Sequence, residues 1–452
     1  MTGTGKTTKT IGKTGIGIID GVLSGTAWSG SVTYAFPTSS SVYTYAGEPD
    51  NAFGAISSMQ QTAARFALDT AFGNAANNGF SVEGFTNLSV SKGTTTGSNL
   101  RFGESNDPPT AWAYYPGETD GDGDLWFGRA EDYRSPVAGN YAWATMLHEI
   151  GHALGLKHGH ESENGFSALP ASKDSMEYSI MTYRAAIGDS ASDGYRNGEF
   201  DYAQSYMMAD IAALQRMYGA DFTTNSGNTV YKWKPGNGDT LVNGKVAIDA
   251  GGNRIFATIW DGGGKDTYDL SSYKTGVSVD LRPGQHSKFS DAQIALLNFE
   301  TDVYARGNIF NALLFKGDTR SLIENAKGGS GSDVLRGNQA NNTLQGNAGA
   351  DKLFGMLGND KLNGGTGNDT LTGGKGYDDF IFKKGYGRDT ITDFKDNVDD
   401  IDLRSYNFSS VKKVLAKADQ VGSDVHIELG GNDALILKKF DLDNLDKGDF
   451  LL

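Results

Sequence analysis

Cysteine is absent from the 452 residues of this chain, which excludes disulfides, thiolate zinc sites and cysteine nucleophiles. No apolar run approaches the roughly 20 residues that a membrane-spanning helix needs. The N-terminal stretch carries lysines but lacks the apolar core and small-residue cleavage site of a secretory signal peptide. Taken alone, these absences indicate a cytosolic protein, and an extracellular one would need a staple other than disulfides.

Positive charge is also scarce relative to negative charge. Lysine and arginine number 40 against 55 aspartates and glutamates, a formal net charge of −15. This excess argues against nucleic acid and anionic membrane surfaces as partners and is compatible with the binding of many cations. Glycine, by contrast, is abundant at 62 residues, which indicates either low complexity or a glycine-punctuated repeat.

The periodicity of apolar residues changes along the chain. From about residue 25 to 220 it is typical of a mixed α/β domain. Helices are expected at about 55–72, 141–154 and 205–218, and strand-like stretches lie at 99–102, 111–115 and 124–127. After Asp221 the helical spacing disappears, and short β-rich pieces follow one another between glycine and asparagine turns. The chain therefore divides into an α/β part and an all-β part.

Four of the six histidines lie within thirteen residues, in the stretch HEIGHALGLKHGH. His148 and His152 are one helical turn apart, so both imidazoles can reach one cation at ~2.0–2.1 Å. Gly155 should break the helix and let the chain bring His158 back toward the same point. Three neutral imidazoles with one open position are the ligand set of a catalytic zinc.

Glu149 follows the first of these histidines and cannot share its coordination direction. It is placed to act as the general base toward a water that zinc activates. The alternative is that the histidines are ordinary helix residues, which the full HExxHxxGxxH pattern disfavours. His160 competes with His158 for the third ligand position, but the spacing of six residues from His152 favours His158.

From Gly328 the chain repeats every nine residues, in six units that begin GGSGSDVLR and end GGKGYDDFI. Each unit has the pattern GGxGxD, and an apolar residue stands two positions after the aspartate. The glycines permit tight turns, and the aspartate supplies a hard oxygen ligand. Unit two departs from the pattern with Ala340 and Asn342, which predicts a weak or missing cation site there. A disordered acidic linker is the alternative, and the regularity argues against it.

Two consecutive repeats should form one coil of a parallel β-roll, so that residues eighteen apart stack. One edge would carry Asp333, Asp351 and Asp369, and the other Asp360 and Asp378. Such rows of carboxylates repel one another, and a thin leucine core cannot offset the chain entropy. Calcium ions bound between the turns neutralise the carboxylates, stabilise the thin core and take the place of disulfides.

Two motifs resemble known families. HEIGHALGLKH is similar to the zinc signature of metzincin endopeptidases, and the Ser179–Tyr183 stretch SIMTY resembles their methionine turn. The resemblance implies that Met181 packs beneath the zinc ligands. It further implies that Tyr183 ligates zinc in the resting enzyme and then swings away to stabilise the oxyanion.

The nonapeptides resemble the RTX calcium-binding array, and the two motifs together resemble the serralysin family of secreted bacterial proteases. The resemblance implies an α/β metzincin-type catalytic domain followed by an all-β parallel β-roll. We expect an arm or short pro-segment at 1–20, the zinc protease domain at 21–222 and the calcium-binding roll with its secretion signal at 223–452. It also implies several structural calcium ions besides one catalytic zinc.

The family's calcium sites use positions two, four and six of one repeat and one, three and six of the next but one, with further sites at the domain junction. The calcium ligands implied in this chain are Asn225, Gly227, Thr229, Asp261, Gly263, Gly264, Asp266, Glu324, Gly329, Gly331, Asp333, Gly346, Asn347, Ala348, Gly349, Asp351, Met356, Gly358, Asp360, Gly364, Thr366, Asp369, Gly373, Lys375 and Asp378.

The resemblance also suggests partners and a location. The terminal residues DFLL are similar to the signal for one-step export through a type I transporter of Gram-negative bacteria, which would place the protein outside the cell. Protein substrates, this transporter and a small proteinaceous inhibitor are the expected partners of a monomer. A non-enzymatic RTX surface protein is the alternative, and the intact Glu149 argues against it. A lipase on the same scaffold would need a G-x-S-x-G motif, which the chain lacks.

Overall fold

The computed structural model describes residues 5–452, which form two compact units. The first runs from the start of the described residues to Ser226 and also contains Asn237–Gly262 and Ala292–Asp318. The second contains Gly227–Gly236, Gly263–Asp291 and Thr319–Leu452. Two segments beyond residue 222 therefore belong to the first unit. The predicted domain limits stay predictions, and residues 1–4 of the expected arm lie outside the described residues.

The first unit is a mixed α/β structure. Its helices are α1 (Gly17–Asp20), α2 (Ser58–Leu68), α3 (Val82–Phe85), α4 (Tyr141–Leu154) and α5 (Met208–Tyr218). Its strands are β1 (Thr8–Thr10), β2 (Thr26–Trp28), β3 (Val32–Ala35), β4 (Val90–Lys92), β5 (Leu100–Ser105), β6 (Ala111–Ala113), β7 (Leu125–Gly128), β9 (Asn237–Val242), β10 (Lys245–Ile248), β11 (Ala257–Ile259), β15 (Leu296–Asn298), β16 (Val303–Tyr304) and β17 (Ile309–Asn311).

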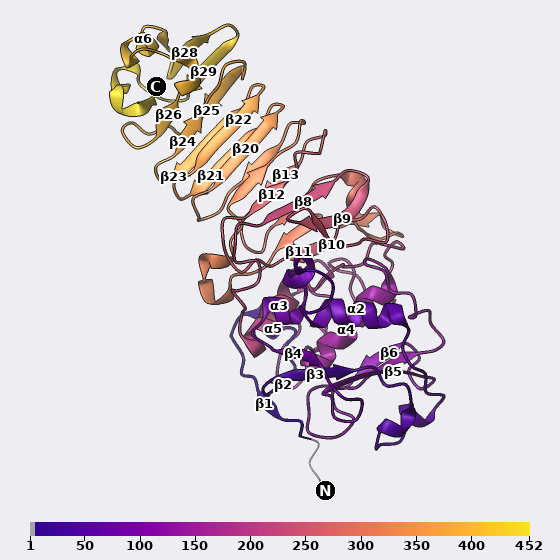
Figure 1. The fold of residues 1–452 in the computed structure, drawn as a ribbon. Coiled ribbons are helices and arrows are strands. Elements are labelled where there is room, and N and C mark those ends of the chain that lie inside the picture. Colours follow the sequence, from indigo (N-terminus) through magenta and orange to yellow (C-terminus); the bar gives the residue numbers. More distant parts are fainter. Residues whose placement is uncertain (1–4) are drawn as a thin grey trace. The chain divides into compact units, whose positions relative to one another are not determined.

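Five of these strands form one sheet in the order β4-β3-β5-β7-β6. The pairs are parallel except at β6, which runs antiparallel to β7 and forms an edge of the sheet. Strand β5 is buried at every residue. Figure 1 shows α2 and α4 lying over this sheet.

Helix α4 has the bounds that the sequence predicts, and its ends explain why. The side chain of Asn140 accepts the N–H of Trp143 at 2.9 Å and caps the first turn. Gly155 ends the helix with a φ of 108°, a left-handed conformation that favours glycine. The predicted helix at 55–72 is shorter, because Ser57 and Gln60 form a capping box that starts it at Ser58.

The second unit is almost entirely β. Its strands are β8 (Val230–Lys234), β12 (Thr267–Asp269), β13 (Ser278–Asp280), β14 (His286–Ser287), β18 (Asn325–Lys327), β19 (Val334–Arg336), β20 (Thr343–Ala348), β21 (Lys352–Leu357), β22 (Lys361–Thr366), β23 (Thr370–Lys375), β24 (Asp379–Ile381), β25 (Arg388–Ile391), β26 (Asp400–Asp402), β27 (Ala418–Val421), β28 (Asp424–Gly430), β29 (Asp433–Leu437) and β30 (Phe450–Leu451), with one short helix, α6 (Val411–Leu415).

The repeats alternate between two parallel ladders. Strands β18, β20, β22 and β24 stack in one sheet and β19, β21, β23 and β25 in the other (Figure 1). Leu344 pairs with Leu362 and Leu353 with Leu371, a separation of eighteen residues in both ladders. These leucines are fully buried between the sheets. The predicted parallel β-roll with two repeats per coil is confirmed.

Candidate active site and cation-binding turns

Three histidines converge at the C-terminal end of α4. His148 and His152 project from successive turns of the helix, and His158 returns from the segment after Gly155. One ring nitrogen from each lies within 4.8 Å of the other two, and Nε2 of His152 is 3.1 Å from Nε2 of His158. The predicted trio is therefore brought together.

Backbone carbonyls decide which nitrogen of each ring is free. Nδ1 of His148 lies 2.8 Å from the carbonyl of Ile180, and Nδ1 of His152 lies 2.7 Å from that of Leu156. A carbonyl only accepts, so each Nδ1 carries the proton and each Nε2 presents a lone pair. Burial also lowers the pKa of His148 to about 3, which keeps its ring neutral.

These lone pairs fit a zinc ion. Nε2 of His152 directs its lone pair toward Nε2 of His158, 3.1 Å away, where a cation can bind both nitrogens. Two ligands at 2.0–2.1 Å from one tetrahedral ion are about 3.3 Å apart, close to the separation of these atoms. Neutral imidazoles oriented by carbonyls through Nδ1 are the usual donor set of such a site.

Glu149 lies beside the trio and is buried. Its Oε2 has no hydrogen-bond partner among the described residues, and burial raises the pKa of the carboxyl to about 8. Glu149 and His148 line a cavity of about 420 Å³ together with Tyr183 and Tyr195. A carboxyl of raised pKa at a cavity wall can accept a proton and return it near neutral pH.

The SIMTY segment lies beneath and beside the histidines. Met181 is fully buried, and a Cβ on Gly151 would come within 2.6 Å of its sulfur, so only glycine fits there. The ring of Tyr183 lies 4.5 Å from that of His158 and 5.7 Å from that of His148. Met181 thus packs against α4 next to His152, and Tyr183 is near the trio.

A buried aspartate that sequence reasoning missed holds this segment. Asp210, at the start of α5, accepts the hydroxyl of Ser179 at 2.5 Å and the N–H of Ile180 at 2.9 Å. Because the Ile180 carbonyl in turn orients His148, Asp210 supports a ligand indirectly. An acidic residue in the otherwise apolar first half of this helix, residues 208–214, was the available signal.

His160 lies outside the trio. Its ring lies 4.6 Å from that of Tyr183 at a tilt of 34°, and its Nδ1 accepts the N–H of Tyr183 at 3.3 Å. His160 belongs to a second group of side chains that could hold a metal ion, together with His158 and Glu161. The preference for His158 over His160 as the third converging histidine agrees with this geometry.

The aspartates of the repeats form two hydrogen-bonded ladders in the second unit. Oδ1 of Asp351 accepts the N–H of Asp333 at 2.7 Å, and Oδ1 of Asp369 accepts that of Asp351 at 2.8 Å. On the other edge, Oδ1 of Asp378 accepts the N–H of Asp360 at 3.0 Å. Each turn is therefore tied to the next through one carboxylate oxygen.

The second oxygen of these carboxylates is left over. Oδ2 is buried and has no hydrogen-bond partner among the described residues in Asp351, Asp360, Asp369 and Asp378. Burial raises the pKa of Asp351 and Asp360 to about 7. Buried oxygens of this kind, next to a carboxylate of the same row, fit a hard divalent cation.

The turn backbones have the conformations that the repeat requires. The predicted ligand positions Asn347, Gly349, Met356 and Gly358 all adopt positive φ, and the N–H of Gly349 donates to the carbonyl of Thr366 at 2.9 Å. Of the other predicted positions, Gly329 and Gly331 lie between β18 and β19, whereas the rest lie in the C-terminal halves of β20, β22 and β23, namely Gly346, Ala348, Gly364, Thr366, Gly373 and Lys375.

Asn342 replaces the aspartate in the second repeat and behaves differently. Its Nδ2 donates to the carbonyl of Glu324 at 2.9 Å, and its Oδ1 accepts the N–H of Asn338 at 2.7 Å. The amide of Asn342 thus has protein partners for both its oxygen and its nitrogen, whereas four of the five repeat aspartates keep one oxygen without a partner among the described residues. This difference agrees with a weak or missing site at repeat two.

The ligands expected near the domain junction are divided between the units. In the second unit, Asp266 accepts the N–H of Thr229 at 2.7 Å, and Glu324 accepts that of Asp266 at 2.8 Å. A Cβ on Gly264 would lie 2.4 Å from the carbonyl of Gly227, so these segments touch. Gly263 belongs to the same unit. Asn225 and Asp261 belong to the first unit.

A seventh repeat at Lys384–Thr392, KGYGRDTIT, also escaped sequence reasoning. Oδ1 of Asp389 accepts the N–H of Asp369 at 2.9 Å, and Gly387 has a φ of 106° like the turn glycines before it. The offset is twenty residues instead of eighteen, because Phe382 and Lys383 are inserted. Because of this insertion, a strict spacing of nine residues does not reveal the seventh repeat.

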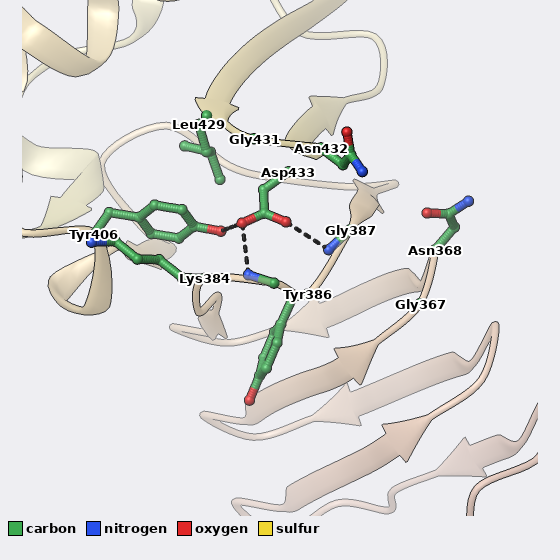
Figure 2. Close-up of a pocket in the computed structure, with 12 residues that line it drawn as sticks. Gly367, Asn368, Lys384, Tyr386, Gly387, Tyr406, Leu429, Gly431, Asn432 and Asp433 are labelled. Carbon is green, nitrogen blue, oxygen red and sulfur yellow. Dashed lines mark hydrogen bonds between the residues drawn. The ribbon is translucent and has the colours of Figure 1, made fainter.

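Asp433 ends this ladder. Its carboxylate accepts the N–H groups of Gly385 at 2.8 Å and Gly387 at 3.1 Å and the Tyr406 hydroxyl at 2.9 Å (Figure 2). In the preceding turn, the N–H of Gly367 donates to a backbone carbonyl of the next repeat instead. A cavity of about 700 Å³ borders these residues, where a further turn would otherwise stack. Asp433 therefore caps the roll.

The chain matches two protein-family models. "Peptidase M10 serralysin C terminal" matches residues 220–450, and "Matrixin" matches residues 85–180. These matches support a metzincin-type α/β domain followed by the β-roll.

Curated relatives agree with these models. Serralysin C of Dickeya chrysanthemi is 36% identical over 231 residues, 50% of this chain and 42% of the relative. Metallopeptidase AprA of Pseudomonas marginalis is 30% identical over 68% of this chain and 60% of its own length. Serralysin of Proteus mirabilis is 33% identical over 68% of this chain and 59% of its own length. The chain thus aligns with about two to three fifths of each relative. No helix among the described residues is long and apolar enough to cross a bilayer.

Proposed function

This chain belongs to the serralysin family, and from that premise we propose that it is a secreted zinc-dependent endopeptidase that hydrolyses extracellular proteins. One observation carries the proposal. The Nε2 lone pairs of His148, His152 and His158 converge beside Glu149, a buried carboxylate with an oxygen that no described residue binds. Three neutral ligands with an adjacent general base are the minimum that metal-assisted peptide hydrolysis requires.

The residues divide the chemistry between them. Zinc bound by His148, His152 and His158 supplies a Lewis acid that makes water acidic near pH 7 and polarises the scissile carbonyl. Glu149 accepts the proton of the attacking water and later donates it to the leaving amine. Its place on the wall of the cavity that His148 also lines suits both steps.

Tyr183 is proposed as the second catalytic residue and as a fourth zinc ligand at rest. Its ring stacks on that of His148 and is tilted against that of His158, and burial raises the pKa of its hydroxyl to about 12, so it remains a hydrogen-bond donor. A donor held beside the metal can stabilise the oxyanion as the carbonyl becomes tetrahedral.

The substrate is proposed to bind as an extended strand along β6. This strand forms the antiparallel edge of the five-stranded sheet and is half-buried, so its backbone can pair with a peptide. Ala111 of β6 lines the same cavity as Glu149, which would bring the paired peptide to the base.

The second unit is proposed to bind several calcium ions through the ligand positions given above. Its unused aspartate oxygens support this, as does the family. We further propose the division into a pro-segment, a protease domain and a roll, export by a type I transporter, and a small proteinaceous inhibitor as a partner of the monomer.

Casein digestion with and without a chelator tests the activity. Digestion should stop with the chelator and return with added zinc. The variant Glu149→Gln should retain zinc yet lose on the order of 10²–10⁴-fold or more in turnover. Glu199→Gln, which changes an exposed glutamate of the same unit, is the matched control and should digest casein normally. Near wild-type turnover by Glu149→Gln would contradict the proposed mechanism.

A further inference from the structure

The carboxylate of Glu161 lies between two imidazoles. Its Oε2 is 3.1 Å from Nδ1 of His158, and its Oε1 is 3.4 Å from Nε2 of His160. One carboxylate therefore bridges the third converging histidine and the histidine next to it. The side chain of Glu161 is half-exposed, so its position needs a reason other than packing.

The protons around this bridge can be assigned. The carboxylate of Glu161 accepts, so Nδ1 of His158 carries a proton and its Nε2 stays free for a metal. Nδ1 of His160 accepts the N–H of Tyr183, so the proton of neutral His160 lies on Nε2, facing Glu161. A second metal ion in this group would need the Nε2 lone pair of His160, which this arrangement does not offer.

Lys157 fixes the backbone from which Glu161 projects. Its side chain is fully buried, and its ammonium donates to the carbonyls of Glu161 at 2.5 Å, His158 at 3.0 Å and Gly21 at 2.6 Å. These bonds close the segment from 157 to 161 into a tight loop. The buried ammonium of Lys157 thus fixes the backbone that orients the half-exposed carboxylate of Glu161.

Stacking adds a second connection. The ring of His160 lies 5.2 Å from that of His158 and 4.6 Å from that of Tyr183. His160 also receives the Tyr183 backbone N–H, so the orientation of this ring affects both neighbours. Glu161 therefore contacts the proposed zinc ligand His158 directly and is connected to Tyr183 through His160.

We propose that Glu161 is a positioning residue that orients His158 as a metal ligand and, through His160, holds the Tyr183 backbone. This inference rests on the proposed function for its metal, but the hydrogen bonds themselves do not. Carboxylates bonded to the far nitrogen of a ligating histidine typically account for 10–100-fold in metal affinity.

The first experiment reads the protons without zinc. The zinc-free full chain is labelled with ¹⁵N-histidine, and imidazole NMR above pH 7.5 assigns the tautomers of its six histidines. His158 should carry its proton on Nδ1 and His160 on Nε2, and Glu161→Ala should mix both tautomers. Glu163→Gln is the control, because Glu163 also lies close to His158 but binds the Tyr115 hydroxyl instead. The other tautomer in either ring, or no change in Glu161→Ala, would overturn the proposal.

The second experiment measures zinc binding in the full chain carrying Glu149→Gln, which prevents self-digestion. Competition with a chromophoric chelator should give one tight zinc per chain. Glu161→Ala should weaken it about 10–100-fold and Glu161→Gln less, since one amide oxygen can still accept from His158. Glu163→Gln should remain within about threefold of the parent. Equal affinities for the Glu161 variants, or a second zinc that the variants abolish, would overturn the positioning role.

The third readout separates the two ends of the bridge. In the otherwise native chain, His160→Ala should lower kcat while KM changes little, because it releases the Tyr183 backbone but leaves the trio intact. If the Glu149→Gln chain binds no zinc but the tautomers are as predicted, the proposed function is wrong and the Glu161 bridge between His158 and His160 is still supported. If the native chain digests casein and Glu161→Ala binds zinc normally in the Glu149→Gln background, the positioning role fails and the function stands.

Discussion

The histidine trio and the aspartate ladders prepare for a cation in opposite ways. Each of the proposed helix ligands His148 and His152 is oriented by a backbone carbonyl, and α4 is buried and capped by Asn140 and Gly155. The ladders stack carboxylates, and each repeat contributes one buried apolar side chain such as Leu353. From this difference we expect the first unit to fold without zinc and the repeats of the second unit to need calcium in order to fold.

The strongest test of this contrast is selective removal of each metal. Removing calcium while retaining zinc should unfold the repeats at about 328–392, because the aspartates then repel one another within a thin core. Removing zinc alone should leave both units folded. Circular dichroism and melting curves titrated with calcium would measure this, with magnesium as the control ion. A β signal and melting temperature that ignore calcium would contradict the contrast.

A single ladder position should show the same dependence on a smaller scale. Asp351→Ala removes a carboxylate that is tied to the turns before and after it, so the calcium midpoint for folding should rise at least about tenfold. Asn342→Ala is the matched control in the repeat whose amide bonds within the protein. It should cost about 1–3 kcal/mol and raise the midpoint by less than Asp351→Ala does, because it removes no carboxylate. Equal midpoint shifts would remove the distinction between the two repeats.

The first unit should instead respond to a broken internal hydrogen bond. Asp210→Ala leaves the N–H groups of Ile180 and Met207 buried without their acceptor, which should cost about 1–3 kcal/mol for each group. Thermal melts should show a lower transition with zinc present or absent. Asp193→Ala, which alters an exposed pair with Arg196, should change the melting temperature little.

The smallest structural effect is expected for Tyr183→Phe. The side chain is 37% exposed, so loss of its hydroxyl should leave the melting temperature within about 2 °C. Turnover should still fall, though less than in Glu149→Gln, and KM should stay close to the parent value because the oxyanion forms only during the reaction. Steady-state kinetics on a fluorogenic peptide would separate the two constants. An unchanged kcat would remove Tyr183 from catalysis.

Local patterns were enough to predict the parts of this protein that repeat or lie on one helix. The spacing of His148 and His152 predicts the convergence that α4 produces, because a helical turn brings residues four apart to one face. The nonapeptide period likewise predicts the pairing of Leu344 with Leu362, since each repeat adds half a coil. Both outcomes depend on geometry within a short segment.

The tertiary structure alone decided the rest. Asp210 reaches the SIMTY segment from thirty residues away, and Asp433 caps Gly387 from forty-six residues away. Glu161 is close in sequence to His158, yet its role depends on the buried ammonium of Lys157 and on the Tyr183 backbone. No periodicity encodes such contacts. They arise because a buried or convergent polar group must find a partner, and only the packed chain determines which partner is within reach.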